Sequence, residues 1–315
     1  MTGDAIWSAA DIGDLTGRVA LVTGANSGIG YQTAAALAEH GAHVILACRD
    51  ADKARRARDK LESELERSSL ELLHLDLADL VSVRRAAEEV LTAHARLDIL
   101  VNNAGVMGTP YRQTADGFEL QMATNHLGHF ALTGLLLDRI VTTERSRIVS
   151  VSSLMHHMGR LRPDDVAGAA FHNTWIAYGT SKLANLLFTA ELSRRLEAAG
   201  VPTRALAAHP GWTRSNLAGS GAALGNNRLR RKLARAAGST FGQSAAGGAL
   251  PVLCAATSSS VRSGQYIGPA NLFGLYGPPR VARPSRRARD LQAAPQLWTA
   301  SEDLTGVRSS VGAPV

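Results

Sequence analysis

Cysteine and aromatic residues are scarce in this sequence, and long apolar runs are absent. The 315 residues include two cysteines, Cys48 and Cys254, so a disulfide framework is implausible and a reducing, intracellular compartment fits. No stretch approaches the roughly 18 apolar residues that a membrane-spanning helix needs. Residues 1–15 carry aspartates and no basic residue, the opposite of a secretory signal. We therefore expect a cytoplasmic protein without a transmembrane anchor.

Acidic residues are missing from one long part of the chain. None lies between Ala198 and Arg289, where arginine and lysine recur, and the net charge is +7. Such a balance is compatible with an anionic partner, nucleic acid or a membrane surface, and equally with an ordinary solvated surface. Aromatic residues make up 5% of the chain and are not interleaved with the basic ones, so we expect no nucleic-acid partner.

Strand-like and helical segments alternate regularly over the first two hundred residues. Short, mostly apolar runs occupy residues 19–23, 43–47, 70–75, 98–101, 147–151 and 203–208. Helical patterns lie near residues 30–40, 52–66, 80–94, 117–140 and 177–199. This alternation predicts an α/β fold in a single domain over residues 1–315: a doubly wound parallel sheet with helices on both faces, the Rossmann arrangement. Ligands of such sheets bind at the carboxyl ends of the strands.

A glycine-rich turn follows the first predicted strand, where a dinucleotide fold binds phosphate. Glycines there allow a tight turn and a close approach of the backbone to the pyrophosphate, and the next helix directs its N-terminal amides toward it. The residues predicted to bind the cofactor in this turn are Gly24, Asn26, Ser27, Gly28, Ile29 and Gly30.

Arg49 and Asp50 follow the second strand, about where such a fold contacts the adenosine ribose. An acidic residue there accepts from a 2′-hydroxyl, whereas the forked arginine donor suits a 2′-phosphate. Arg49 therefore favours NADP(H) over NAD(H), although Asp50 is adjacent and both residues could simply begin the next helix. Further cofactor contacts are predicted after the third and fourth strands, at Asp76, Leu77, Asn103, Ala104 and Gly105.

Tyr178 and Lys182 carry the strongest chemical signal. Residues four apart share one face of a helix, which places the lysine beneath the tyrosine. A free tyrosine titrates near pH ~10, and a nearby ammonium favours the phenolate, which suits an acid/base working near neutral pH. Ser153 ends the fifth strand at the same edge of the sheet, and Asn125 lies in the helix before it.

Taken together, these motifs resemble the short-chain dehydrogenase/reductase family. The resemblance covers about Gly17 to Ile267 and rests on Thr23-Gly-x-x-x-Gly28-x-Gly30, Asn102-Asn-Ala-Gly105, Asn125, Ser153, Tyr178-x-x-x-Lys182 and His209-Pro-Gly-Trp-Thr213. It implies hydride transfer between a nicotinamide and a carbonyl or alcohol. Ser153, the second of a serine pair, would bind the substrate oxygen and Tyr178 would be the acid/base. Lys182 would hold the nicotinamide ribose, and Asn125 would support a water chain.

The long segment between Ser153 and Tyr178 resembles the retinol dehydrogenase-like group, which includes WW-domain oxidoreductases and protochlorophyllide reductases. Many members act on lipophilic aldehydes or retinoids and favour NADP(H). The alternatives are an NAD-dependent alcohol dehydrogenase for a small or steroid-like substrate and a non-catalytic nucleotide-sensing protein. Family members are often dimers or tetramers, so a homo-oligomer and a monomer both stay open.

The remaining expectations concern the substrate side and the histidines. Pro210, Gly211 and Thr213 are predicted to bind the cofactor, and by the resemblance Thr213 reaches the nicotinamide amide. The Gly-, Ala- and Arg-rich stretch near residues 213–240 predicts a mobile lid over the substrate, with a membrane-surface contact as the alternative. A C-terminal extension is expected after residue 268. Four histidines could be mistaken for metal ligands, but no cysteine or carboxylate completes a set with them, and the hydride transfer needs no metal. We expect packing or loop hydrogen bonds, and no metal, at His126, His129, His156 and His157.

Overall fold

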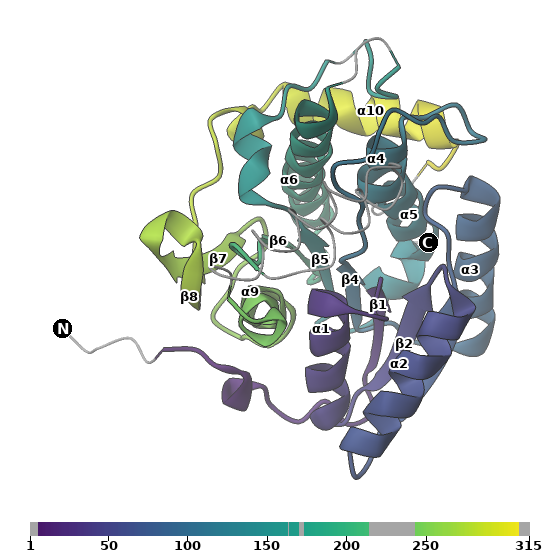
Figure 1. The fold of residues 1–315 in the computed structure, drawn as a ribbon, viewed down its shortest axis with the longest axis vertical. Helices are drawn as coiled ribbons and strands as arrows, with labels where there is room; N and C mark the ends of the chain where they lie inside the picture. Colours follow the sequence, from purple (N-terminus) through teal and green to yellow (C-terminus); the bar gives the residue numbers. More distant parts are fainter. Residues whose placement is uncertain (1–5, 163, 170–172, 214–242, 309–315) are drawn as a thin grey trace, which may run out of the picture.

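One eight-stranded sheet forms the centre of the fold (Figure 1). The computed structural model describes residues 6–162, 164–169, 173–213 and 243–308. The strand order is β3-β2-β1-β4-β5-β6-β7-β8, and all neighbours are parallel except the pair β7 and β8. The strands are β1 (Val19–Thr23), β2 (His43–Cys48), β3 (Ser69–His74), β4 (Ile99–Asn102), β5 (Arg147–Val151), β6 (Arg204–Ala208), β7 (Tyr266–Asn271) and β8 (Tyr276–Val281).

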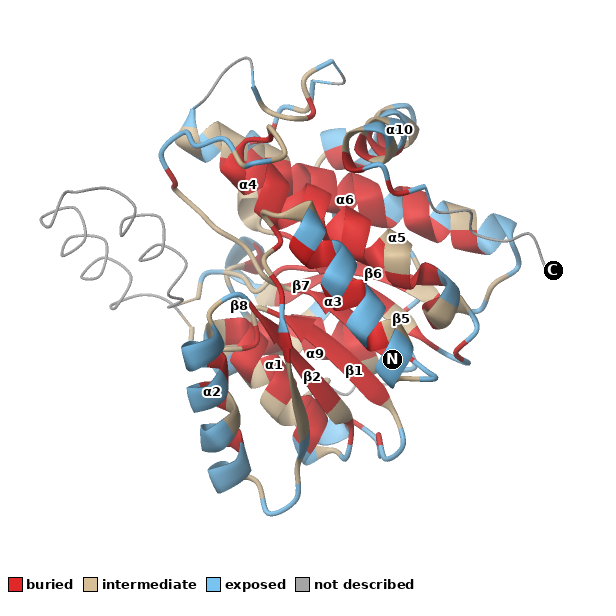
Figure 2. Cartoon of the chain, turned by 90° about the vertical axis from the view of Figure 1, so that its right-hand side faces the viewer, coloured by how far each residue is buried: buried red, intermediate tan, exposed pale blue. Residues whose placement is uncertain are grey.

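Helices cover both faces of this sheet, and alternate strand residues point to the two layers. Val22 belongs to the core beneath α1, α2 and α9, whereas Leu21 belongs to the core beneath α3, α5 and α6. Figure 2 shows the buried strands between the layers. The predicted α/β class, with a doubly wound sheet, is confirmed. The helices are α1 (Gly28–Glu39), α2 (Ala51–Glu64), α3 (Leu80–Ala93), α4 (Leu120–Met122), α5 (Gly128–Val141), α6 (Thr174–Ala198), α9 (Ala245–Thr257) and α10 (Ala293–Thr305).

The segments predicted from residues 19–208 lie within a few residues of the observed ones, but the C-terminal elements were not predicted. The segment after residue 268, expected as an extension, completes β7 and forms β8 and α10, and Trp298 of α10 is 2% exposed in the core. α9 is apolar almost all round, with Pro251 inside it, so it shows no amphipathic stripe. β8 is an edge strand containing Pro278 and Pro279, and proline argues against a strand from sequence alone.

Two further expectations of the sequence concern membranes and thiols. None of the helices in the described part of the chain is long and apolar enough to cross a bilayer. Cys48 and Cys254 are both buried free thiols, and burial raises the pKa of each to about 11. Neither thiol is therefore ionised near neutral pH.

Candidate active site

Thr23 joins the first and fourth strands where both end. Its hydroxyl accepts hydrogen bonds from the backbone N–H groups of Asn103 and Ala104, each at 2.9 Å, and lies 2.9 Å from Nε2 of His129. The side chain of Asn103 donates to the carbonyl of Thr23 at 2.8 Å. The turns after β1 and β4 are thereby fixed against each other at the carboxyl edge of the sheet. Sequence reasoning missed this role of Thr23 and His129, because it depends on contacts between distant segments.

Three glycines shape the turn between β1 and α1. Gly24 and Gly28 have left-handed backbone conformations, with φ of +67° and +58°. A Cβ on Gly30 would lie 2.4 Å from the carbonyl oxygen of Gly24, so α1 can approach the strand only with glycine there. A Cβ on Gly28 would meet no atom within 4 Å, which leaves open space beside the N-terminal amides of α1 for a phosphate. Of the other residues predicted in the turn, Asn26 is half-buried, Ser27 is exposed and Ile29 is buried.

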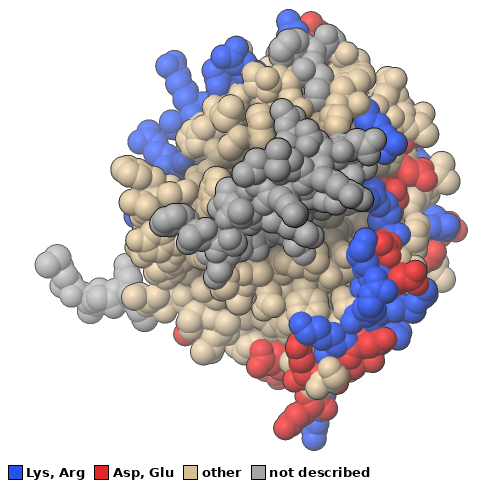
Figure 3. Space-filling model, viewed as in Figure 1, with Lys and Arg blue, Asp and Glu red and all other residues tan. Residues whose placement is uncertain are grey.

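Arg49 and Asp50, adjacent in sequence, have different surroundings. The carboxylate of Asp50 caps α2, accepting from the backbone N–H of Lys53 at 3.0 Å and from its ammonium at 2.6 Å. These bonds hold the pKa of Asp50 at about 2. The Arg49 guanidinium is exposed and lies 3.9 Å from the carboxylate of Asp76, at the end of the neighbouring strand. Acidic and basic side chains interleave over the adjacent α2 (Figure 3).

Asp76 and Leu77 lie between β3 and α3. One carboxylate oxygen of Asp76 accepts from the backbone N–H of Ala78 at 3.0 Å. The carbonyl oxygen of Leu77 packs so closely on α5 that a Cβ on Gly128 would lie 2.2 Å from it. This turn is thereby held against the start of α5, the helix that directly follows the π-helical turn of Asn125.

Tyr178 and Lys182 lie one turn apart on α6, as the spacing predicts, and are 6% and 3% exposed. The Lys182 ammonium donates to the carbonyl of Val151 at 3.0 Å and lies 5.8 Å from the centre of the Tyr178 ring. A Cβ on Gly105 would lie 3.4 Å from the Lys182 Nζ and 3.0 Å from Oδ1 of Asn125. The turn after β4, the end of β5 and the start of α6 therefore meet at this point.

Burial dominates the titration of this pair. It raises the pKa of Tyr178 to about 12, and a hydrogen bond with Ser153 opposes the shift. It lowers the pKa of Lys182 to about 8. The predicted lowering of the tyrosine pKa is therefore wrong for the protein without its cofactor: burial raises the pKa of Tyr178, and the cause that opposes burial is Ser153. At neutral pH the phenol keeps its proton.

Only one of the two serines after β5 faces the tyrosine. The Ser152 hydroxyl is buried and donates to the carbonyl of Lys182 at 2.8 Å. Ser153 is half-buried, is hydrogen-bonded to Tyr178, and accepts from the backbone N–H of Met155 at 3.2 Å at the start of the 3₁₀ helix Leu154–Met158. This geometry matches the predicted preference for Ser153, and its catalytic role stays a prediction.

Asn125 lies in a π-helical turn, Ala123–Leu127, between α4 and α5. Such turns frequently mark functional sites. Its side chain accepts from the backbone N–H of Val106 at 2.8 Å and donates to the carbonyl of Val106 at 3.0 Å and to Oγ of Ser181 at 2.9 Å. Asn125 thus ties the turn after β4 to α6, next to Lys182. Its predicted part in a water chain stays a prediction.

The segment after β6 reaches the same edge of the sheet. Gly211 has φ of +68°, and a Cβ there would lie 2.4 Å from the carbonyl oxygen of Leu275. The side-chain amide of Gln243 donates to the carbonyl of Pro210, and Thr213 pairs with Gln243 in a parallel bridge. The lid predicted for residues 213–240 lies, apart from Thr213, outside the described residues.

The four histidines of the sequence analysis lie in the interior or in a loop. His126 and His129 are buried, and burial lowers their pKa values to about 4 and 3. His126 bonds to Ser301 of α10, which connects α10 to the π-helical turn. His156 is also buried, with its pKa lowered to about 4, and His157 is exposed beside it. These positions agree with the predicted packing roles.

One cavity, of about 310 Å³, lies near the start of α6. It is not lined by the candidate catalytic tetrad, which is Asn125, Ser153, Tyr178 and Lys182. It is lined from α6 by Ile176, Ala177 and Thr180, and from a neighbouring loop by Arg160 and Arg162. Ala177 precedes Tyr178 in sequence, yet the tetrad side chains are not among the lining residues.

Comparison with known proteins agrees with this arrangement. The sequence profile of the short chain dehydrogenase family matches residues 18–223. The chain belongs to the short-chain dehydrogenase family. It is 40% identical to bovine (Bos taurus) retinol dehydrogenase 12 over 93% of this chain and 88% of that protein. It is also 40% identical to human retinol dehydrogenase 13, over 98% of this chain and 90% of that one. These relatives place it in the retinol dehydrogenase-like group of short-chain dehydrogenases.

Solved structures of this dehydrogenase family share the fold. An uncharacterized protein from Mycobacterium paratuberculosis superposes with a TM-score of 0.78, at 41% identity, over 98% of this chain and all (100%) of that one. A short chain dehydrogenase from Shigella flexneri, complexed with NADP, superposes with a TM-score of 0.60, at 25% identity, over 80% of this chain and 96% of that one. The family assignment makes the chain an oxidoreductase that uses an NAD(P) cofactor.

Proposed function

We propose that this protein is an NADP(H)-dependent oxidoreductase that interconverts a lipophilic aldehyde or ketone and the corresponding alcohol. The observation that carries the proposal is the meeting of Ser153, Tyr178 and Lys182 at the carboxyl edge of the sheet. Asn125 and Gly105 lie against the same lysine. The nucleotide-sensing alternative predicts a missing serine, tyrosine or lysine, and all three are present.

The tetrad residues divide the proton chemistry among them. In the reductive direction Tyr178 donates its phenolic proton to the substrate oxygen, and a pKa near 12 keeps that proton in place at pH 7. Ser153 donates a hydrogen bond to the same oxygen as negative charge develops on it. Lys182, held by the Val151 carbonyl, stabilises the phenolate left behind. The nicotinamide, when bound, supplies or accepts the hydride.

One observation supports a dinucleotide at this edge of the sheet, and a second favours NADP(H) over NAD(H). The open space beside Gly28 suits a pyrophosphate at the N-terminus of α1. At the ribose end, Asp50 is committed to capping α2, so its carboxylate is drawn away from a ribose 2′-hydroxyl, while the Arg49 guanidinium is exposed and offers two parallel donors to a 2′-phosphate. The NADP complex of the Shigella flexneri relative is in keeping with this proposal.

Exposed apolar side chains that lie near the candidate site residues in the sequence support a lipophilic substrate. Trp175 lies one turn before Tyr178 and is 49% exposed, and Met158 ends the 3₁₀ helix that Ser153 begins. Trp212 directly follows Gly211. Burying such side chains against a substrate removes apolar surface from water at about 25 cal/mol per Å². The relatives named as retinol dehydrogenases suggest retinoids and long-chain aldehydes as the first compounds to test.

The test is nucleotide oxidation by the purified protein with NADPH and NADH against retinal, long-chain, aromatic and small aldehydes and simple ketones. We expect turnover that favours NADPH and the lipophilic aldehydes. Tyr178→Phe should lower kcat by at least roughly 100-fold, because it removes the proton donor. Tyr276→Phe, which removes an exposed phenol on β8, is the matched control and should retain activity. Turnover that survives in Tyr178→Phe would show that the tyrosine is not the proton donor.

A second pair of variants tests the cofactor within the same assay. Arg49→Leu should raise KM for NADPH roughly 10- to 100-fold and leave KM for NADH nearly unchanged, because charge-assisted hydrogen bonds are worth about 1.5–3 kcal/mol. Arg55→Leu on α2, whose guanidinium pairs with Asp52, should change neither value. A lower KM for NADH than for NADPH in the wild type would favour an NAD-dependent dehydrogenase. Tight nucleotide binding without turnover of any compound would favour the nucleotide-sensing alternative.

A further inference from the structure

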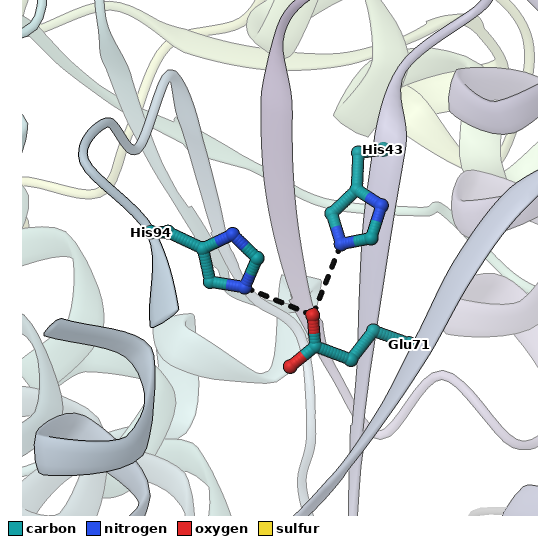
Figure 4. A group of neighbouring side chains, drawn as sticks. All are labelled: His43, Glu71 and His94. Atoms are coloured by element: carbon teal, nitrogen blue, oxygen red, sulfur yellow. Dashed lines mark hydrogen bonds and ion pairs between the residues drawn. The ribbon is translucent and has the colours of Figure 1, made fainter. Parts of the chain in front are cut away.

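Three side chains at the amino end of the sheet direct potential metal ligands toward one point (Figure 4). His43 begins β2, Glu71 lies in β3, and His94 directly follows α3. Oε2 of Glu71 lies 3.0 Å from Nε2 of His43 and 2.9 Å from Nε2 of His94. The three ligand atoms lie within 4.8 Å of one another.

We propose that His43, Glu71 and His94 bind a divalent transition-metal ion, with zinc as the representative. Two imidazole nitrogens and one carboxylate oxygen are a ligand set that zinc uses in proteins, with water in the fourth tetrahedral position. The side chains of His43, His94 and Glu71 are 28%, 13% and 35% exposed. The group is therefore accessible to an ion and its water, although each side chain is largely packed against the protein.

The surroundings of the histidines support ligation through Nε2. Nδ1 of His43 lies 2.7 Å from Oγ of Ser69, and a serine oxygen that accepts the Nδ1 hydrogen leaves the Nε2 lone pair for a metal. Behind His94, the guanidinium of Arg139 donates to its backbone carbonyl and the backbone N–H bonds to the carbonyl of Val90. Metal binding releases any proton that Nε2 carries, so the ion exchanges for protons and no redox step is involved.

The position of the site separates it from the hydride transfer. β3 is an edge strand, and the three ligands come from that edge, from β2 and from the end of α3. From His43 to Cys48, β2 runs over about 16 Å toward the nucleotide edge, at ~3.3 Å per residue. A bound ion would therefore connect the edge strand to its neighbours and raise the free energy of unfolding. It would not contact the tetrad.

The test uses the untagged full-length protein, freed of metal with a chelator and titrated with ZnCl₂ by calorimetry. We expect one zinc ion per chain in the wild type. Affinity should fall at least tenfold in His94→Ala and in Glu71→Gln, and roughly tenfold in Ser69→Ala, as for other residues that orient a metal ligand. His74→Ala, which removes an exposed histidine of β3 outside the group, is the matched control and should bind as the wild type does.

Cobalt supplies a second measurement that does not depend on activity. Co²⁺ bound to two histidines and a carboxylate should give visible d–d absorption in the wild type and in His74→Ala, and the absorption should disappear in His94→Ala. Circular dichroism of each variant identifies any that fails to fold. Absence of zinc binding by the wild type, or equal affinity in the wild type and both ligand variants, would overturn the proposal.

Discussion

At the scale of single residues, the chemistry follows from which groups are removed from water. Ser152 and Ser153 are adjacent in sequence, yet one is buried against the carbonyl of Lys182 and the other faces Tyr178. The sequence could favour the second serine only through a family resemblance. The group of His43, Glu71 and His94 could not be predicted from the sequence at all. No spacing along the chain indicates that β2, β3 and the end of α3 bring these side chains together.

Lys182 leads to a prediction about pH. Burial lowers its pKa to about 8, so the ammonium is present below pH 8 and is lost as the pH rises through that value. Tyr178, with a pKa near 12, stays protonated over the same interval. The kcat/KM for carbonyl reduction with NADPH should therefore be level below pH ~7 and fall about tenfold per unit well above pH 8.

The matched variant is Lys182→Arg, whose guanidinium stays charged throughout this interval. Its activity should be lower at every pH, but the decline above pH 8 should be absent. The measurement is kcat/KM from pH 6 to 10, with protein stability checked at each pH. A wild-type profile that stays level to pH 10 would contradict the assignment of Lys182 as the titrating group.

At the scale of elements, the site depends on backbones that touch. α6 packs on the 3₁₀ helix after Ser153 through two glycines, and a Cβ on Gly179 would lie 2.6 Å from the carbonyl oxygen of Met155 and 3.0 Å from the backbone nitrogen of Gly159. Gly179→Ala should push the two elements apart. We expect a loss of about 1–3 kcal/mol in the free energy of unfolding.

The same variant should lower kcat by about 10- to 100-fold, because a misplacement near 1 Å between Ser153 and Tyr178 is costly to catalysis. Gly13→Ala is the control, since a Cβ at Gly13 would meet nothing within 4 Å and its φ is not positive. Urea unfolding and steady-state kinetics with NADPH measure both effects. Wild-type stability and kcat in Gly179→Ala would show that the contact can relax at no cost.

Elements were predictable where their patterns are local. The six strands between residues 19 and 208 are apolar runs that alternate with helices, and the sequence predicts them within a few residues. α9 was missed because it is apolar almost all round, and β8 because two prolines occupy an edge strand. The π-helical turn around Asn125 also has no local signal, since it depends on the bonds to Val106 and Ser181.

At the scale of the whole molecule, the sheet separates two ligand sites by placing them at opposite ends of its strands. The nucleotide turn follows the carboxyl end of β1, whereas the proposed metal site lies at the amino end of β2. Sites more than about 7–10 Å apart that share no partners act additively on stability to within ~0.5 kcal/mol. NADPH and zinc should therefore each raise Tm, and together they should raise it by the sum of the two shifts.

Thermal unfolding with saturating NADPH, saturating zinc, both, and neither checks this additivity. For a chain of 315 residues a coupling of 0.5 kcal/mol corresponds to roughly 0.8 °C, so a clearly larger departure from the sum would show that the two ends of the sheet communicate. His94→Ala separates the contributions, because it should lose the zinc shift and keep the NADPH shift. An ion bound only at the edge of the sheet should leave the nucleotide turn unchanged. If His94→Ala also lost the NADPH shift, His94 would be needed for the stability of the whole sheet and not only for zinc binding.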